Sequence, residues 1–184
     1  MNWIIPGTTL EGLRSNADRT DGLFQSMFLA GGLTLSQVSS ITGLESYTIQ
    51  NWVKRGFLAP PQNKRYNMEQ VCRIIIINML KGCLALDQIC SLISHINGNL
   101  ADESDDIIDD TELYFKFVSL AARARHIGGS KEWGEALEEV MAGYEEPYPG
   151  ARDKIIHVLR IMLTAWVAAR LKAQVDGMIT QLNQ

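Results

Sequence analysis

The sequence predicts a mainly α-helical protein with one short β wing and a bundle of helices at its C-terminal end. Two observations carry this prediction. Apolar residues recur at helical spacing along most of the 184 residues, and glycine, proline or asparagine separates these stretches. The segment 60–66 joins a proline pair to a short basic stretch, which favours two extended strands and a turn.

Residues 1–32 are expected to form an N-terminal helical arm. Leu23, Phe24, Met27 and Phe28 fall at helical spacing, and a glycine pair follows them.

Two short helices separated by a tight turn are expected next. The turn is placed at Gly43–Glu45, and Ser46 is the expected N-cap of the second helix. Two helices joined in this way make a helix-turn-helix, whose second helix fits a DNA major groove. The residues expected to face inward are Leu35, Val38, Ile41, Ile49, Trp52 and Val53.

A wing should follow, with its turn at Gln62-Asn63. Asn67 then caps a third helix, and Gln70 completes a capping box three residues later. A fourth helix is expected over about residues 86–95. The inward positions of these two helices are Val71, Ile74, Ile75, Ile77, Leu80, Ile89, Leu92, Ile93 and Ile96.

Residues 99–112 hold seven acidic side chains and no basic one. We interpret residues 99–111 as a solvated acidic linker, because the run lacks the spacing of a calcium-binding loop. Thr111 is expected to cap the next helix.

The C-terminal helical domain is predicted over residues 112–184, with helices at about 112–126, 130–144 and 152–182. The last helix is apolar nearly all round between Ile155 and Leu171, so it must be covered on several sides. It is the expected seam of a homodimer. Its apolar positions favour a packed bundle over a long coiled coil.

Charge is unevenly distributed along the chain. The net charge is −4, yet residues 33–98 carry six basic and three acidic side chains. The predicted winged helix-turn-helix, residues 33–98, is therefore locally basic, as a partner of duplex DNA would be.

Base and phosphate contacts are expected from the second helix and from the wing. Gln and Asn side chains can bond adenine, and Lys and Arg can bond guanine or phosphate. Wing residues would hold the sugar-phosphate backbone. The candidate DNA-binding residues are Tyr47, Thr48, Gln50, Asn51, Lys54, Arg55, Asn63, Lys64, Arg65 and Tyr66.

Residues 34–93 resemble the winged helix-turn-helix of MerR-type transcription regulators. The resemblance lies in Gly43, Thr48-Ile49, Trp52, Gly56-Phe57-Leu58, Lys64-x-Tyr66, Gly82 and Leu86-x-x-Ile89. It implies a MerR-like fold and a regulator of transcription. Gln50 and Asn51 differ from the Arg and Tyr common at these places in that family, and Val53 replaces an acidic residue.

A longer stretch, from about Leu29 to Tyr114, is similar to the bacterial domain of unknown function numbered 1836. The strings GLESYTIQNWVKRGFL, P-x-N-K-R-Y and INGNLADESDDIIDD carry this similarity. The resemblance implies no assigned activity.

Other functional classes lack support in the sequence. No nucleotide-binding loop or nucleophile motif occurs, so neither catalysis nor a cofactor is expected. The three histidines (His95, His126 and His157) and three cysteines lack metal-ligand spacing, so no metal is expected. Core packing is the default role of Trp133, Tyr144, Tyr148 and Trp166, with a small-molecule effector pocket as the alternative.

Neither a secretory leader nor a membrane span is recognisable, and the cysteines form no paired motif. A cytoplasmic protein is therefore expected. The leading hypothesis is a dimeric transcription regulator that binds duplex DNA. The alternative is a degenerate winged-helix module that docks another protein and does not bind DNA.

Overall fold

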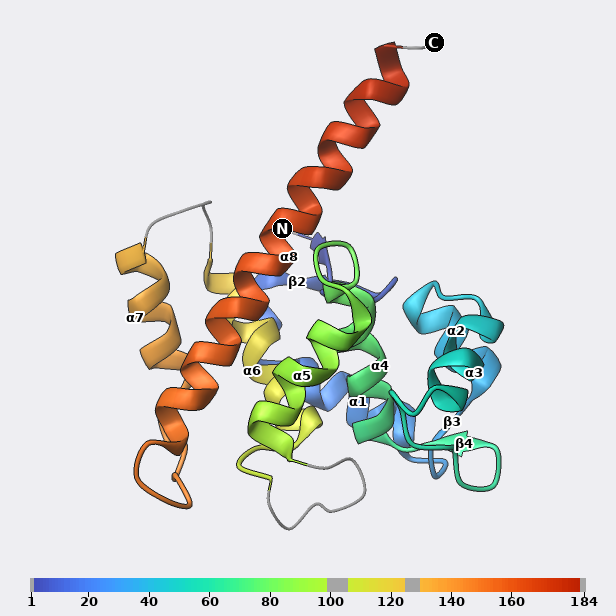
Figure 1. The fold of residues 1–184 in the computed structure, drawn as a ribbon, viewed down its shortest axis with the longest axis horizontal. Helices are drawn as coiled ribbons and strands as arrows, with labels where there is room; N and C mark the ends of the chain where they lie inside the picture. The colour runs from blue at the N-terminus through green and yellow to red at the C-terminus, as the bar shows by residue number, and fades with distance from the viewer. Residues whose placement is uncertain (1, 99–105, 125–129, 183–184) are drawn as a thin grey trace.

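The computed structural model describes residues 2–98, 106–124 and 130–182, and these residues are mainly helical, as predicted (Figure 1). The strands are β1 (Asn2–Ile4), β2 (Glu11–Leu13), β3 (Leu33–Thr34) and β4 (Arg65–Tyr66). A 3-10 helix, η1 (Arg14–Arg19), precedes the α helices. These are α1 (Thr20–Phe28), α2 (Leu35–Thr42), α3 (Ser46–Lys54), α4 (Met68–Leu80), α5 (Leu86–Asn97), α6 (Asp110–Arg123), α7 (Ser130–Val140) and α8 (Ala151–Leu182).

Helix α4 lies at the centre of the molecule and packs against α2, α5, α6 and α8 (Figure 1). The sequence pattern predicted one buried face for this helix. Instead Cys72, Arg73, Ile76 and Met79 are buried as well. The run of four isoleucines at 74–77 leaves no polar face, and a helix without one must be covered on all sides.

The N-terminal segment begins with a β-hairpin that the predicted helical arm did not include. Strands β1 and β2 pair antiparallel, with Trp3 opposite Gly12. Phe24 of α1 is fully buried, and the Tyr114 hydroxyl of α6 donates a hydrogen bond of 2.9 Å to the Pro6 carbonyl. Buried side chains from the N-terminal segment, the α2–α5 region and the last three helices form a single continuous core.

Local signals placed some helix starts correctly and others wrongly. The capping box of Asn67 and Gln70 is present at the start of α4. Ser46 was expected to cap α3, but Glu45 holds the N-cap position without a side-chain bond. The Ser46 hydroxyl instead lies 2.9 Å from the hydroxyl of Ser39 on α2.

The predicted wing is also arranged differently. Asn63 and Lys64, not Gln62 and Asn63, form its turn, with φ angles of 49° and 62°. Gln62 and Arg65 form a single bridge across the turn, while β4 pairs with β3. Pro60 and Pro61 have no backbone N–H to donate, so they cannot extend a ladder beside β4.

Residues 99–105 of the predicted acidic linker lie outside the described residues. The described part is only partly solvated, with Asp109 exposed. Ile107 and Ile108 are buried, and Asp110 is 1% exposed. Asp109, not Thr111, caps α6, and its carboxylate accepts the Glu112 N–H at 2.9 Å.

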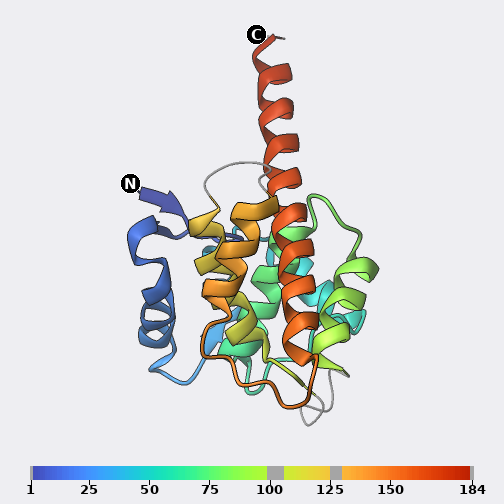
Figure 2. The same ribbon diagram turned by 90° about the vertical axis from the view of Figure 1, so that its left-hand side faces the viewer.

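Helix α8 has 32 residues, and only its first half is covered by the body. Its buried positions run from Ala151 to Trp166, whereas Arg170 and all described residues after it are exposed. Figure 2 shows this second half extending beyond the rest of the molecule. The apolar stretch was expected to be covered by its own domain or by a second copy, and within one chain this cover stops before Leu171, which is 40% exposed.

A close backbone approach at Gly7 joins the N-terminal segment to α4. Gly7 has φ +74°, and a Cβ placed there would lie 2.7 Å from both Cγ2 and the carbonyl oxygen of Ile75. The Asn78 amide of α4 donates to the Gly7 carbonyl at 2.9 Å and to the Thr42 carbonyl at 2.8 Å. The loop therefore has no room for a side chain at this position.

We predict that Gly7→Ala lowers the free energy of unfolding by about 3 kcal/mol, because it adds left-handed backbone strain to overpacking. Urea unfolding followed by circular dichroism measures this change. Gly22→Ala is the control, because a Cβ at Gly22 in α1 meets nothing within 4 Å. It should raise stability by about 0.5 kcal/mol. An equal effect of both substitutions would contradict the proposed contact with Ile75.

Candidate nucleic-acid interface

Helix α3 turns one face to the core and the other to solvent. Ile49 and Trp52 are 0% and 3% exposed. Because a helix repeats every 3.6 residues, the positions between them point outward. The candidate DNA-binding residues of α3 and its C-terminal end lie mostly on this outward side. Tyr47, Gln50, Asn51, Lys54 and Arg55 are exposed, and Thr48 is half-buried.

The cationic side chains of this surface have no acidic partner within the described part of the chain. No described carboxylate forms an ion pair with Lys54, Arg55, Lys64 or Arg65. The Arg55 guanidinium rests over the Phe57 ring, 4.6 Å from its centroid. Their positive charge is therefore left for solvent or for a bound anion.

The loop of residues 59–66 (the 59–66 loop) stands beside α3 and is anchored at its base. Arg65 donates from Nη1 to the Gly32 carbonyl at 2.7 Å. Gly32 has φ +98°, and a Cβ there would lie 2.8 Å from the Tyr66 carbonyl oxygen. Only glycine allows β3 and β4 to approach this closely.

Tyr66 differs from the other candidate residues in being buried. Its side chain is 2% exposed, and burial raises the pKa of its hydroxyl. The sequence placed it among the backbone contacts because Lys64-x-Tyr66 resembled a wing motif. In the structure its side chain packs in the core and supports this loop, while it also lines the groove beside α3.

A groove of about 340 Å³ separates α3 from the 59–66 loop. Its walls are mostly apolar, with polar groups from one residue of α3 and one of the loop. The lining residues are Leu35, Gln50, Val53, Pro61, Lys64 and Tyr66.

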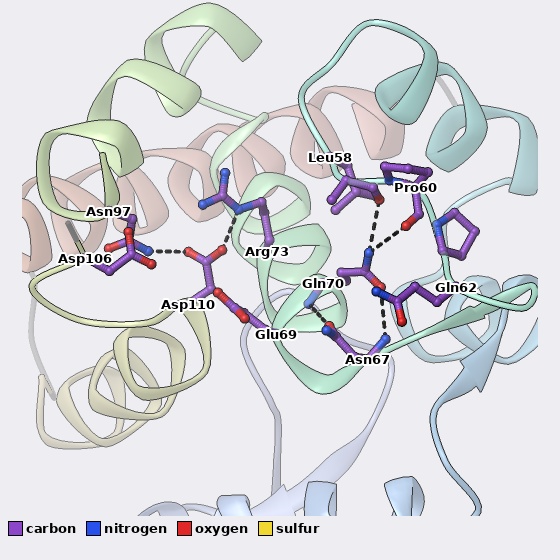
Figure 3. Close-up of a pocket in the computed structure, with 12 residues that line it drawn as sticks. Leu58, Pro60, Gln62, Asn67, Glu69, Gln70, Arg73, Asn97, Asp106 and Asp110 are labelled. Atoms are coloured by element: carbon purple, nitrogen blue, oxygen red, sulfur yellow. Dashed lines mark hydrogen bonds and ion pairs between the residues drawn. The ribbon is translucent and has the colours of Figure 1, made fainter. Parts of the chain in front are cut away.

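Gln70 ties the 59–66 loop to α4. Its Oε1 accepts the Asn67 N–H at 3.0 Å, which completes the capping box. Its Nε2 donates to the carbonyls of Ala59 and Pro60 at 3.2 and 3.0 Å (Figure 3). The capping role of Gln70 was predicted from the sequence. Its bonds to the loop were not, because the two carbonyls lie eleven and ten residues earlier.

A buried ion pair lies one helical turn after Gln70. Arg73 of α4 donates from Nε to Asp110 of α6, and the Asn97 amide of α5 donates to the other carboxylate oxygen of Asp110 at 3.0 Å (Figure 3). Burial raises the pKa of Asp110, and the charge of Arg73 opposes that shift. This triad was not predicted from the sequence, although an arginine directly before four isoleucines was its visible signal.

The triad forms one side of a pocket of about 330 Å³ whose other side is Leu58 and the start of the 59–66 loop, residues 59–62 (Figure 3). Within the described residues, Asn97 Oδ1 is buried and has no hydrogen-bond partner. This pocket therefore joins α4, α5 and α6 to the loop beside α3.

Comparison with known families covers the same part of the chain. Residues 30–117 match the family model described as Domain of unknown function (DUF1836). The matched segment runs from the residues before β3 into α6, so it includes α3, the 59–66 loop and the buried triad.

One curated relative is the "Uncharacterized protein YkrK" of Bacillus subtilis (strain 168). It is 31% identical over 84 residues, which are 44% of this chain and 36% of the relative. The chain thus spans about a third of that relative's length. No solved structure matches the chain.

The remaining sequence candidates are dispersed. The Tyr144 hydroxyl donates to the Ile107 carbonyl, whereas Trp166 packs edge-on against Phe117, 5.9 Å between ring centroids. Tyr148 is 43% exposed. His126 lies outside the described residues, and the residues that are described contain no cluster of three metal-binding side chains. Among the described helices, none combines the length and apolarity needed to span a bilayer.

We predict that Asp110→Asn lowers the free energy of unfolding by about 3 kcal/mol, because it leaves the Arg73 charge buried without its partner. The double variant Arg73→Met/Asp110→Leu removes both charges and should regain most of that loss. Urea unfolding measures both changes.

The control for this prediction is the exposed pair Lys172–Asp176, whose partners are 67% and 58% exposed. Asp176→Asn should change stability by less than about 0.5 kcal/mol. If the double variant is as unstable as Asp110→Asn, the loss does not come from an unpaired buried charge.

Proposed function

We propose that this protein is a transcription regulator that binds duplex DNA. In this proposal α2 and α3 form a MerR-like helix-turn-helix and the 59–66 loop is its wing. Helix α3 enters the major groove, and the loop lies along the sugar-phosphate backbone.

The supporting observation is the set of cations on one surface that have no acidic partner among the described residues. Lys54 and Arg55 end α3, while Lys64 and Arg65 lie in the adjoining loop. In a chain of net charge −4, this surface is suited to a polyanion. In this proposal Lys54, Lys64 and Arg65 bond phosphates, and Arg55 bonds phosphate or guanine, as these side chains generally do in duplex recognition.

Gln50 and Asn51 are the proposed base-reading residues. Both are exposed on the outer face of α3, and an amide side chain bonds adenine through two atoms. Tyr47 is 72% exposed on the first turn of α3, and Thr48 is beside it. Asn63 adds a backbone contact at the loop turn.

A second candidate is a winged module that docks another protein and does not bind DNA. The apolar groove between α3 and the 59–66 loop favours it, because Leu35, Val53 and Pro61 would receive an apolar side chain of a partner. The groove and the cations share one surface, so only one of these partners occupies it at a time.

We further propose that the DNA-binding form is a homodimer joined through the projecting half of α8. Leu171, Val175, Met178 and Leu182 are 40%, 53%, 59% and 85% exposed. Their spacing of four, three and four residues lines one side of the helix, which is the spacing of a two-stranded coiled coil. The stripe is identical on a second copy, which therefore covers it without any other partner. The apolar positions of the last helix, taken along its whole length, had favoured a packed bundle over a coiled coil. The first half of α8 does pack in that way.

A dimer would also lengthen the DNA sequence that the protein recognises. A single unit reads few base pairs, and a two-fold pair reads half-sites about 34 Å apart.

We predict that the wild-type protein binds duplex DNA with a log–log salt slope of about −3 per subunit. Lys54→Gln/Arg55→Gln/Lys64→Gln should weaken binding and flatten this slope, because it removes phosphate contacts and leaves the Arg65–Gly32 bond intact. Fluorescence anisotropy with a labelled duplex at several salt concentrations measures both effects.

The matched control is Arg19→Gln/Lys154→Gln/Arg160→Gln, which removes the same charge from exposed positions elsewhere. It should leave the slope unchanged. Absence of duplex binding by the wild-type protein at low salt would rule out the proposal and leave the protein-docking candidate.

We predict that Val175→Glu/Met178→Glu converts a dimer to a monomer, because it places charges on the shared apolar stripe. Analytical ultracentrifugation measures the mass. Ala173→Glu/Thr180→Glu, on the opposite side of the same helix, should leave the dimer intact. A wild-type monomer at micromolar concentration would contradict the proposed interface.

A further inference from the structure

A separate pocket lies where the N-terminal hairpin meets α8. It has a volume of about 520 Å³. Its walls are residues 3–7, Arg14 at the start of η1, and Trp166 and Arg170 of α8. None of these residues belongs to the proposed DNA surface.

Each arginine of this pocket is held against a tryptophan. The Arg14 guanidinium lies 5.1 Å from the centroid of the Trp3 ring, and that of Arg170 lies 4.7 Å from the Trp166 ring. A cation–π contact holds a guanidinium near the ring, and its five N–H donors give it the capacity to bond an anion as well.

Neither arginine has an acidic partner among the described residues. No aspartate or glutamate lines the pocket, and no carboxylate in the described ranges forms an ion pair with Arg14 or Arg170. Two like charges that face one concave space repel each other, and a bound anion relieves that repulsion. Pocket residues of this kind recognise carboxylate or phosphate through paired hydrogen bonds.

The remaining wall is apolar. Ile5 is buried, while the neighbouring Ile4 is 52% exposed at the pocket. Pro6 adds a further apolar surface. A ligand that fits this wall carries an apolar body beside its acidic group. An inorganic anion would leave the wall uncovered.

We propose that this pocket binds a small organic anion, with a phosphate or carboxylate held between Arg14 and Arg170 and an apolar or aromatic body against Ile4 and Ile5. The bound anion connects the N-terminal hairpin to α8 at the point where α8 leaves the body. This site is independent of whether α3 binds DNA.

Phenyl phosphate tests the proposal, because it combines an aromatic ring with a phosphate. Isothermal titration calorimetry on the full chain should show saturable binding at one site per chain. Arg14→Gln and Arg170→Gln should each weaken it about tenfold, since each removes a charge-assisted hydrogen bond. Arg160→Gln is the matched control: Arg160 is exposed on the same helix but does not line the pocket.

Inorganic phosphate and phenol, which supply only the charge or only the ring, should each bind at least about tenfold more weakly than phenyl phosphate. Thermal melts followed by circular dichroism verify that each variant is folded. If Arg14→Gln is not folded, Arg14→Lys replaces it, and this change should still weaken binding because lysine lacks the planar fork. Lack of saturation at about 10 mM phenyl phosphate, equal loss in Arg160→Gln, or equally tight phenol binding would each overturn the proposal.

Discussion

The structure depends on the charge that Arg73 brings into the centre of the molecule. Helix α4 is covered on all sides, and Arg73 is only 7% exposed, so its charge is largely removed from water and needs a counter-charge from the protein. Asp110 supplies it from the first turn of α6, and Asn97 at the end of α5 orients the carboxylate. A buried ion pair adds little net stability, but it penalises every arrangement in which its partners are separated. It therefore fixes how α5, which precedes the acidic segment, and α6, which follows it, pack against α4. The 59–66 loop depends on the same helix, because Gln70 lies one turn before Arg73 and holds the carbonyls of Ala59 and Pro60.

Short-range signals in the sequence explain most of the helical framework. The Asn67–Gln70 box, the glycines around α2 and α3, and the inward residues of α4 and α5 act within one or two helical turns, and all lie where the pattern placed them. The signals that misled are those whose outcome depends on distant partners. Ser46 could cap a helix, but a hydroxyl of α2 lies next to it. Asp110 belongs to an acidic run that looks solvated until Arg73, 37 residues earlier, is placed beside it.

The candidate surface was predictable in part for the same reason. Ile49 and Trp52 define the buried face of α3, and this alone determines that Gln50, Asn51 and Lys54 face outward. The loop was harder to predict, because β4 pairs with β3 and not with the proline segment beside it in sequence. Tyr66 was misplaced as a result, since its burial follows from that long-range pairing. The Arg14 and Arg170 pocket had no local signal at all, because its walls come from opposite ends of the chain.

The pairing of β3 with β4 has a topological consequence. Leu33 lies opposite Tyr66, so the chain enters and leaves the α2–α3 unit at the same place. The 32 residues between these two partners form a loop-like insertion that contains α2 and α3. Its two ends are held together by the hydrogen bond from Arg65 to the Gly32 carbonyl and by the close approach at Gly32. The order in which α4 and the later helices follow one another does not depend on the sequence of this insertion. Its outer face can therefore change in sequence, or even in length, without rerouting the rest of the chain, and recognition can diversify while the scaffold persists.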